Sequence, residues 1–241
     1  MPWNASCAPR FEGSGFFKDK LPETLEVSDF SGEQIMKPKA VVFDIGNVLI
    51  EWQPERFFDS VIGAERRRAM FAAVDLHAMN DRVDSGETFH DVIREMADAT
   101  PDWQDEIMLW HDRWLDMASP AIDHSVRLMA ALQSKGIPVF SLTNFGIQTY
   151  VIAAERYPFL NQFDRDFISG HLGIIKPNTD IYQALETTSG IAPQALLFTD
   201  DRPENIAAAA ARDWQTHHFE SPQGWANRLV AEELLTPEEA A

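Results

Sequence analysis

Polar side chains that could do chemistry stand at four places along this chain, each close to a short apolar run. In chain order these are Asp44 after residues 41–43, Thr143 after residues 139–142, Lys176 just before Pro177, and the pair Asp200 and Asp201 after residues 196–199. A carboxylate can act as a nucleophile or bind a metal ion, a hydroxyl can donate a hydrogen bond to an anion, and an ammonium group can neutralise one. Together these groups would suit a site that binds an anion beside a metal ion.

The adjacent carboxylates of Asp200 and Asp201 indicate metal binding. Two negative charges at the end of a buried strand repel each other, and a bound cation would remove that cost. Hard oxygen ligands without soft neighbours suit Mg²⁺. A solvated turn would also tolerate the pair, just as Asp44 alone could be a turn residue before Gly46 and Asn47.

Thr143 and Lys176 could supply donors for the anion. A threonine at the carboxyl end of a strand can present its hydroxyl beside the backbone N–H groups that follow it, although Thr143-Asn144 is also ordinary turn chemistry. Lys176 lies in a loop held by Pro177, just before a predicted helix. Any exposed lysine could occupy such a place.

Alternating strands and helices must position these groups. Continuous apolar runs, such as residues 41–43 and 196–199, predict strands covered on both faces, as in a parallel sheet. Helices are predicted after them, for example over residues 125–134 and 203–211. The pattern predicts an α/β fold with a doubly wound, parallel, Rossmann-like sheet. Ligands bind at the carboxyl ends of such strands, so the four places would meet there.

Residues 54–121 show helical patterns only and predict an all-helical insertion. An apolar stripe at helical spacing is formed by Phe89, Val92, Ile93 and Met96. The predicted helices cover residues 56–61, 64–74, 88–97 and 103–117. Asn80, Asp81 and Arg82 lie in a less periodic stretch that could face a ligand. The expected organisation is a poorly ordered extension at 1–35, an α/β core at 36–53 and 122–235, the helical insertion at 54–121, and a tail at 236–241.

Composition narrows the classes of function. The net charge of −18 argues against nucleic acid and against an anionic membrane, while a local lysine and a metal ion can still attract a small phosphorylated ligand. Cys7 is the one cysteine, and no Cys/His cluster has zinc spacing. No apolar run is long enough for a membrane span, and no signal-peptide pattern is present. We expect a cytoplasmic protein and leave its oligomeric state open.

The four motifs together resemble the haloacid dehalogenase-like (HAD) hydrolase superfamily, over roughly residues 38 to 230. Its motifs resemble, in order, residues 42–48 (Val-Phe-Asp-Ile-Gly-Asn-Val), Leu142-Thr143-Asn144, Lys176-Pro177 and Phe198-Thr199-Asp200-Asp201. The helical insertion between the first two is similar to the superfamily's cap, which covers the site and helps to choose the substrate. The first motif is most similar to the branch that contains α-D-glucose-1-phosphate phosphatase.

The resemblance implies a Mg²⁺-dependent phosphatase for a small phosphorylated metabolite, such as a sugar phosphate. Asp44 would attack phosphorus and become an aspartyl phosphate, which water then hydrolyses. The implied metal ligands are Asp44, the Gly46 backbone carbonyl, and Asp200 or Asp201. Thr143 and Lys176 would hold the remaining phosphoryl oxygens, and Asn144 and Asn47 are further candidates for substrate binding.

Gly46 departs from the superfamily's pattern. Most phosphatases of the superfamily carry a second aspartate two positions after the nucleophile, which protonates the leaving group. Glycine can offer only its backbone carbonyl. General acid–base catalysis is typically worth about 10²–10⁴-fold in rate. We therefore expect slower turnover or dependence on a good leaving group, unless a cap residue or water replaces the acid.

Two other functions are open to the same residues. In a metal-free 2-haloacid dehalogenase the same aspartate attacks carbon. The superfamily's dehalogenases usually lack the paired acidic residues and carry an aromatic residue where Gly46 stands, so Asp200 and Asp201 favour the phosphatase. A non-catalytic phospholigand-binding protein would explain the missing acid, but the nucleophile, the lysine and the acidic pair are all present.

Overall fold

The computed structural model describes residues 36–241, so the predicted extension at residues 1–35 lies outside the described residues. Within residues 36–241, a parallel sheet has the strand order β5-β4-β1-β6-β7. Its strands are β1 Ala40–Phe43, β4 Val139–Thr143, β5 Arg165–Ile168, β6 Leu196–Asp200 and β7 Gln215–His218. The predicted doubly wound parallel sheet is confirmed.

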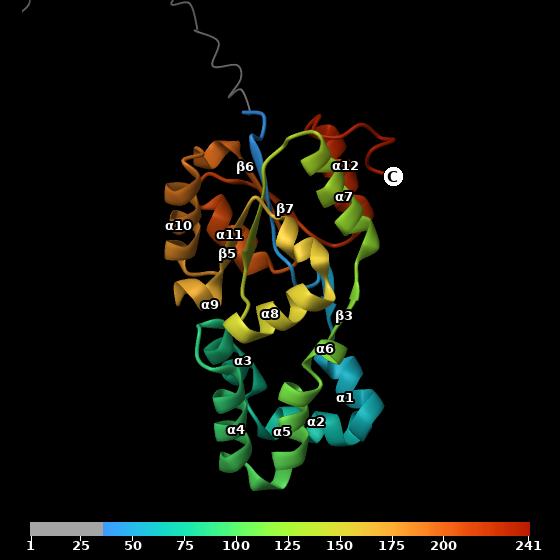
Figure 1. The fold of residues 1–241 in the computed structure, drawn as a ribbon, viewed down its shortest axis with the longest axis vertical. Coiled ribbons are helices and arrows are strands. Elements are labelled where there is room, and N and C mark those ends of the chain that lie inside the picture. The colour runs from blue at the N-terminus through green and yellow to red at the C-terminus, as the bar shows by residue number, and fades with distance from the viewer. Residues whose placement is uncertain (1–35) are drawn as a thin grey trace, which may run out of the picture. The chain divides into compact units, whose positions relative to one another are not determined.

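Alternate residues of β1 face opposite sides of the sheet and enter two separate hydrophobic clusters. Val41 and Phe43 cluster with residues of α7 (Asp123–Ser134) and α12 (Pro222–Ala231). Ala40 and Val42 cluster instead with α10 (Thr179–Ser189) and α11 (Pro203–Ala210). The two helix pairs flank the sheet on either side in Figure 1. β1 is therefore fully buried, as expected for the central strand of a covered sheet.

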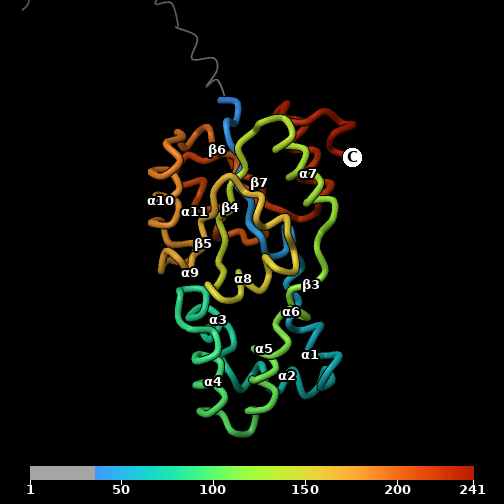
Figure 2. Tube along the Cα trace, in the orientation of Figure 1, coloured from blue at the N-terminus to red at the C-terminus, as the bar shows by residue number. Residues whose placement is uncertain are grey.

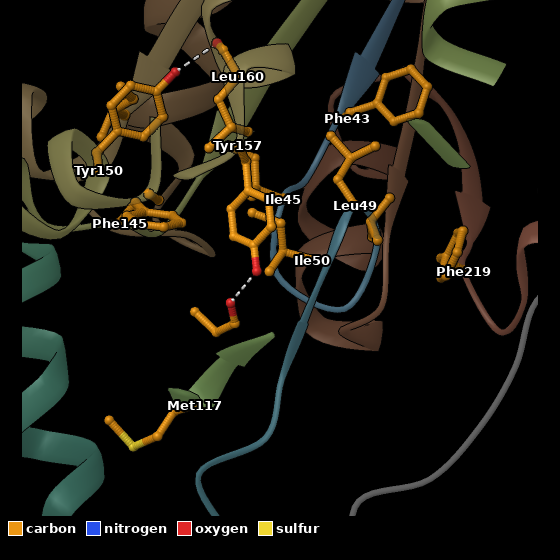
Figure 3. Packing of buried hydrophobic residues seen from close by; sticks show 14 of the residues in the cluster. Phe43, Ile45, Leu49, Ile50, Met117, Phe145, Tyr150, Tyr157, Leu160 and Phe219 are labelled. Carbon is orange, nitrogen blue, oxygen red and sulfur yellow. Dashed lines mark hydrogen bonds between the residues drawn. The ribbon is translucent and has the colours of Figure 1, made fainter. Parts of the chain in front are cut away.

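A two-stranded antiparallel ribbon carries the chain out of the core and back. In it, β2 (Ile50–Trp52) pairs with β3 (Ala118–Ala121). The sequence did not predict β3, because Ala-Ser-Pro-Ala has neither an apolar run nor alternation. Tyr157 of the core donates a hydrogen bond from its hydroxyl to Ala118 O at 2.9 Å, which ties the returning strand to the core (Figure 3).

Between β2 and β3 the described chain is helical, and we refer to these helices as the cap. They are α1 Pro54–Ile62, α2 Ala64–Ala73, α3 Leu76–Asp84, α4 Phe89–Ala99, the 3₁₀ helix η1 Pro101–Trp103, α5 Gln104–Asp112 and α6 Trp114–Met117. The single helix predicted over 103–117 is wrong in length, since it is divided into η1, α5 and α6. Helix α3 was not predicted. The cap helices gather beyond the carboxyl ends of the sheet strands (Figures 1 and 2).

The core contains further helical elements. They are α8 Ile147–Arg156, η2 Pro158–Gln162, α9 Ser169–Leu172 and η3 Pro193–Ala195. The last residues are also docked, because His124 Nε2 lies 2.9 Å from Ala240 O and the Ala240 side chain is buried. Among the described residues, no helix combines the length and the apolar character needed to cross a membrane.

Candidate active site

Asp44 is the first residue after β1, at the carboxyl end of the central strand. Its N–H donates to Thr199 O of β6 at 3.0 Å, so the ladder of the sheet continues past β1 and fixes this backbone. Asp44 Oδ1 accepts a hydrogen bond from Ile45 N at 2.7 Å. Within the described part of the chain, no hydrogen bond reaches Asp44 Oδ2. The side chain lines a cavity, so this oxygen is free to react there.

A tight turn follows Asp44 and positions Asn47. The turn closes on Ile45 O, which accepts hydrogen bonds from the N–H groups of Val48, Leu49 and Ile50. Asn47 has a φ of 54°, in the left-handed region that asparagine tolerates better than most residues. Its Oδ1 accepts from Trp52 N, and its Nδ2 donates to Asp201 Oδ2, both at 2.9 Å. The amide predicted to bind substrate is therefore engaged at both ends, and it orients Asp201.

Lys176 lies buried between two carboxylates. Its Nζ is 3.0 Å from Asp44 Oδ1 and 2.6 Å from Asp200 Oδ2, and it donates to Leu142 O at 2.8 Å. Burial alone would lower the pKa of Lys176, but the neighbouring Asp200 and Asp44 carboxylates outweigh burial and raise it. Lys176 is therefore a fixed cation beside the candidate nucleophile.

Asn144 holds the backbone of Lys176 in place. Its Oδ1 accepts from Lys176 N at 2.7 Å, and its Nδ2 donates to Lys176 O at 3.0 Å. Asn144 lines the cavity, as predicted for a substrate-binding residue, but both ends of its amide already have partners. Thr143 is buried at the end of β4 and is not among the residues that line the cavity. The structure thus places Lys176 and Asn144 in the lining of the cavity, whereas Thr143 is buried outside that lining.

Asp200 and Asp201 occupy different depths of the site. Asp200 is fully buried and accepts hydrogen bonds from Arg202 N at 2.8 Å and from Asn205 Nδ2 at 3.0 Å to both carboxylate oxygens. Asp201 is only partly buried and lines the cavity. Asn205, in the first turn of α11, was missed by the sequence analysis. The available signal was its spacing of five residues after Asp200. The helix that follows a strand begins beside the end of that strand, so a residue in its first turn can contact the last residue of the strand.

Three carboxylates converge in the described part of the chain. Asp44, Asp200 and Asp201 each offer an oxygen atom, and these atoms all lie within 4.8 Å of one another. Burial, with the neighbouring carboxylates, raises the pKa of Asp44 above its ordinary value despite Lys176. A cation between the carboxylates would reverse that effect. The donors are hard oxygen atoms, and the Gly46 backbone lines the same cavity, so this set fits a divalent ion such as Mg²⁺.

The cavity lies between the core and the cap and has a volume of about 370 Å³. Its aromatic wall is formed by Trp52, Phe71, Trp110, Trp114 and Phe145. Trp114 of the cap meets Phe145 of the core edge-on, with ring centroids 5.5 Å apart. Asn80 and Asp81 also line the cavity, as their predicted place facing a ligand requires, whereas Arg82 is not among the lining residues.

Asp84 is a further acidic residue of the cavity that the sequence analysis did not assign. It is the last residue of α3 and is partly buried. Burial raises the pKa of Asp84 to about 7, and the charge of Asp81 adds to that rise. Asn80 Nδ2 donates to Asp84 Oδ2 at 2.8 Å. The cavity therefore contains a carboxylic acid that exchanges its proton near neutral pH.

Comparisons with known proteins agree with the fold. The family model described as haloacid dehalogenase-like hydrolase matches residues 38–213. A HAD family enzyme from Bacteroides thetaiotaomicron has a TM-score of 0.64 at 20% identity, over 80% of this chain and 99% of that chain. Its complex with magnesium and inorganic phosphate gives a TM-score of 0.58 at 22% identity, over 75% and 93%. The L-2-haloacid dehalogenase from Xanthobacter autotrophicus, with chloropropionic acid covalently bound, gives 0.53 at 17% identity, over 84% and 86%.

Proposed function

Because this chain belongs to the haloacid dehalogenase-like hydrolase family, we propose that it is a Mg²⁺-dependent phosphatase that acts through an aspartyl phosphate on Asp44. One observation carries this proposal: oxygen atoms of Asp44, Asp200 and Asp201 lie within 4.8 Å of one another. Three carboxylates this close are costly without a cation. The Bacteroides thetaiotaomicron enzyme that shares the fold binds magnesium and inorganic phosphate, which supports the same assignment.

The residues of the chain would divide the reaction between them. Asp44 Oδ2 forms a bond to phosphorus, and the bond from phosphorus to the ester oxygen breaks, with its electron pair remaining on that oxygen. Lys176 holds Asp44 Oδ1 and adds positive charge next to the phosphoryl group. Bound Mg²⁺ would supply the positive charge that offsets repulsion between the carboxylates and the phosphoryl oxygens. Water then attacks phosphorus and releases phosphate, which restores Asp44.

The cavity indicates a small phosphomonoester as the substrate. Its volume of about 370 Å³ is near the lower end of the roughly 300–1,000 Å³ that ligand pockets span. The phosphoryl group would lie against Asp44 and Lys176, and the leaving group would face the aromatic wall of the cap. A sugar phosphate is one candidate of this size.

A 2-haloacid dehalogenase is the alternative, favoured by the shared fold with the Xanthobacter autotrophicus enzyme. In that reaction Asp44 would attack carbon and expel a halide ion, without using a metal. Lys176 could serve either reaction, because both involve an anionic substrate. The convergence of Asp200 and Asp201 on Asp44 favours the phosphatase, since a carbon substrate gives no reason to gather three carboxylates.

Activity assays with and without metal separate the two functions. We expect purified protein to release phosphate from a panel of small phosphomonoesters with Mg²⁺ present, and to lose that activity with EDTA. Asp44→Asn should lose at least about 10³-fold in kcat, because an amide is a poor nucleophile. Chloride release from 2-chloropropionate in EDTA, without phosphate release in Mg²⁺, would contradict the proposal.

A further inference from the structure

We propose that Asp84, at the end of cap helix α3, is the general acid that protonates the leaving group. This inference rests on the proposed phosphatase function. Gly46 has no side chain to donate a proton, and the rest of the reaction described above leaves the departing ester oxygen without one. Three carboxyl groups of the cap line the cavity, and of these Glu55 and Asp81 are exposed whereas Asp84 is partly buried and has no ion-pair partner among the described residues.

Asp84 is held at a contact between the cap and the core. Its backbone carbonyl accepts a hydrogen bond from the Ser169 hydroxyl at 2.6 Å, and the same hydroxyl accepts from Phe145 N at 2.8 Å. Two residues on, a Cβ added to Gly86 would lie only 2.5 Å from Gly170 O, so this turn packs directly on the core backbone. The position of Asp84 is therefore set by the core as well as by its own helix.

The surroundings of the Asp84 carboxyl group suit a proton donor. Asn80 Nδ2 donates to it at 2.8 Å. Burial raises its pKa and outweighs the opposing effect of this donor and of a backbone hydrogen bond from Gly146, which lowers it. Arg82, two residues before Asp84 in the sequence, forms ion pairs with Glu87 at 2.7 Å and with Glu95 at 2.8 Å. A carboxyl group without a neighbouring cation keeps its proton more readily than one in an ion pair.

The charges that act on Asp84 come from three elements. Asp81 on the same helix and Asp44 on the core raise its pKa, and Lys176 lowers it. The charged side chains of α4 and α9, which also pack against α3, are exposed to solvent and do not face it; they are His90, Asp91, Arg94, Glu95, Asp98 and His171. Burial and these charges together raise the pKa of Asp84 to about 7, which allows it both to give and to regain a proton.

Asp84 also lies on the side of the phosphoryl group toward which the leaving oxygen points. In phosphoryl transfer the attacking and leaving oxygens lie roughly in line through phosphorus. Asp44 attacks from the end of β1, with Lys176 beside it, so the leaving oxygen points away from the sheet and toward the cap. Helix α3 lies among the cap helices beyond the carboxyl ends of the strands (Figure 1), and its Asp84 lines the cavity.

Asp84 gives a proton in the first step of the reaction and regains one in the second. When the bond from phosphorus to the ester oxygen breaks, the carboxylic proton of Asp84 moves to that oxygen, which leaves as an alcohol. Asp84 is then a carboxylate. When water attacks phosphorus of the aspartyl phosphate, Asp84 accepts a proton from that water and returns to its acid form, while the bond from phosphorus to Asp44 breaks and phosphate is released.

Two substrates test this role in the full chain with saturating Mg²⁺. An alkyl phosphomonoester has a basic leaving oxygen that needs a proton, whereas the nitrophenolate of p-nitrophenyl phosphate leaves without one. We expect Asp84→Asn to reduce kcat/KM on the alkyl ester by about 10²-fold or more, and on p-nitrophenyl phosphate by less than about tenfold. The ratio kcat/KM is the readout because it reports departure of the leaving group and not the later hydrolysis of the aspartyl phosphate, which both esters share. The exposed Asp91→Asn variant serves as the control and should change neither rate.

Gly46 offers a rescue. A Cβ built on Gly46 meets nothing within 4 Å, so a side chain can begin at this position without a clash of its Cβ. In Asp84→Asn, the added Gly46→Asp substitution should restore the alkyl ester rate by at least about tenfold. Asp81→Asn leaves Asp84 in place but removes a charge that raises the pKa of Asp84. In the pH–rate profile of the alkyl ester, this variant should shift the alkaline limb to lower pH.

The outcomes separate this inference from the function on which it rests. Equal losses of kcat/KM on both esters in Asp84→Asn, or no loss on either, would overturn the role of Asp84 while the phosphatase function stands. An unmoved alkaline limb in Asp81→Asn would overturn it in the same way. Failure of the wild-type protein to hydrolyse either ester would overturn the proposed function, and the role of Asp84 with it.

Discussion

Lys176 determines the electrostatics at the scale of single residues. Its ammonium group lies within 3.0 Å of Asp44 Oδ1 and within 2.6 Å of Asp200 Oδ2, and all three side chains are nearly excluded from solvent. One buried positive charge does not balance the negative charges of Asp44, Asp200 and the adjacent Asp201. The remaining imbalance favours a divalent cation, and the asparagines around the site hold the carboxylates in place for it.

The proposed acid Asp84 should reduce stability at alkaline pH. Its pKa of about 7 in the folded protein is above the ordinary 3.8, so the folded state binds this proton more tightly than the unfolded chain. That stabilisation is complete below about pH 4 and is lost as the pH rises through about 7. We expect Asp84→Asn to raise the free energy of unfolding at about pH 8 by roughly 2–4 kcal/mol, and to change it little at about pH 4.

Denaturant unfolding at several pH values, with Mg²⁺ present, measures this difference. The Asp91→Asn control should follow the wild-type protein at every pH. A loss of stability in Asp84→Asn that is the same at acid and alkaline pH would contradict the expectation, because it would mean that Asp84 is a structural hydrogen-bond partner and not a strained acid.

Sequence motifs located the residues at strand ends, but not the partners that hold them. Asp44, Lys176, Asp200 and Asp201 follow predicted strands or a predicted loop, and parallel strands bring such positions to one edge. The hydrogen bonds of Asn47 to Asp201 and of Asn144 to Lys176 depend on loop geometry that spacing does not give. Asp84 lies in a segment that shows no strong periodicity, so only tertiary packing reveals that it faces the cavity.

At the scale of elements, helix α3 joins the cap to the core. Its buried residues Leu76, Met79 and Val83 form a narrow stripe, and Asp75 caps its start by accepting from Ala78 N at 3.0 Å. These two features are the local signals for the helix, but a stripe of three apolar residues is too short to give a clear helical period. The strands β1, β4 and β6 were easier to predict, because continuous burial requires continuous apolar sequence.

The contact between α3 and the core predicts a specific effect of one glycine. Gly86 has a φ of +102°, and an added Cβ would lie 2.5 Å from Gly170 O. Gly136 also has a positive φ, of +70°, but its Cβ would meet nothing within 4 Å. We expect Gly136→Ala to cost about 1 kcal/mol of stability and to leave catalysis unchanged. Gly86→Ala should cost about 1–3 kcal/mol more and displace Asp84.

Kinetics and unfolding of the two glycine variants measure this contact. In Gly86→Ala, kcat/KM on an alkyl phosphomonoester should fall by at least about tenfold, and kcat/KM on p-nitrophenyl phosphate should fall less, because Asp84 would be displaced. If Gly86→Ala and Gly136→Ala have the same stability and the same kinetics, α3 is not held against the core as described.

At the scale of the whole molecule, charge opposes the proposed substrate. The chain has a net charge of −18, and the cavity is lined by more carboxylates than cations. A phosphomonoester dianion must approach through this negative field. Composition could not indicate how an anion reaches Lys176 at the base of the site.

The negative field predicts an unusual salt dependence. The Debye length falls from about 30 Å at 0.01 M ionic strength to about 8 Å at 0.15 M. With Mg²⁺ saturating throughout, we expect kcat/KM for a phosphomonoester to rise about two- to tenfold over this range, because salt screens the repulsion. A fall in kcat/KM with added salt would show instead that a positive surface attracts the substrate.

The central claim is that Asp44 carries the phosphoryl group, and mass spectrometry of an acid-quenched reaction tests it most directly. Under rapid quench with Mg²⁺ and p-nitrophenyl phosphate, we predict that the peptide containing Asp44 gains the mass of one HPO₃ group at that residue, and that EDTA prevents this gain. Phosphate release together with an adduct on a different residue would contradict the account. So would an Asp44 peptide that gains a 1-carboxyethyl ester from 2-chloropropionate, with release of chloride, but never a phosphoryl group.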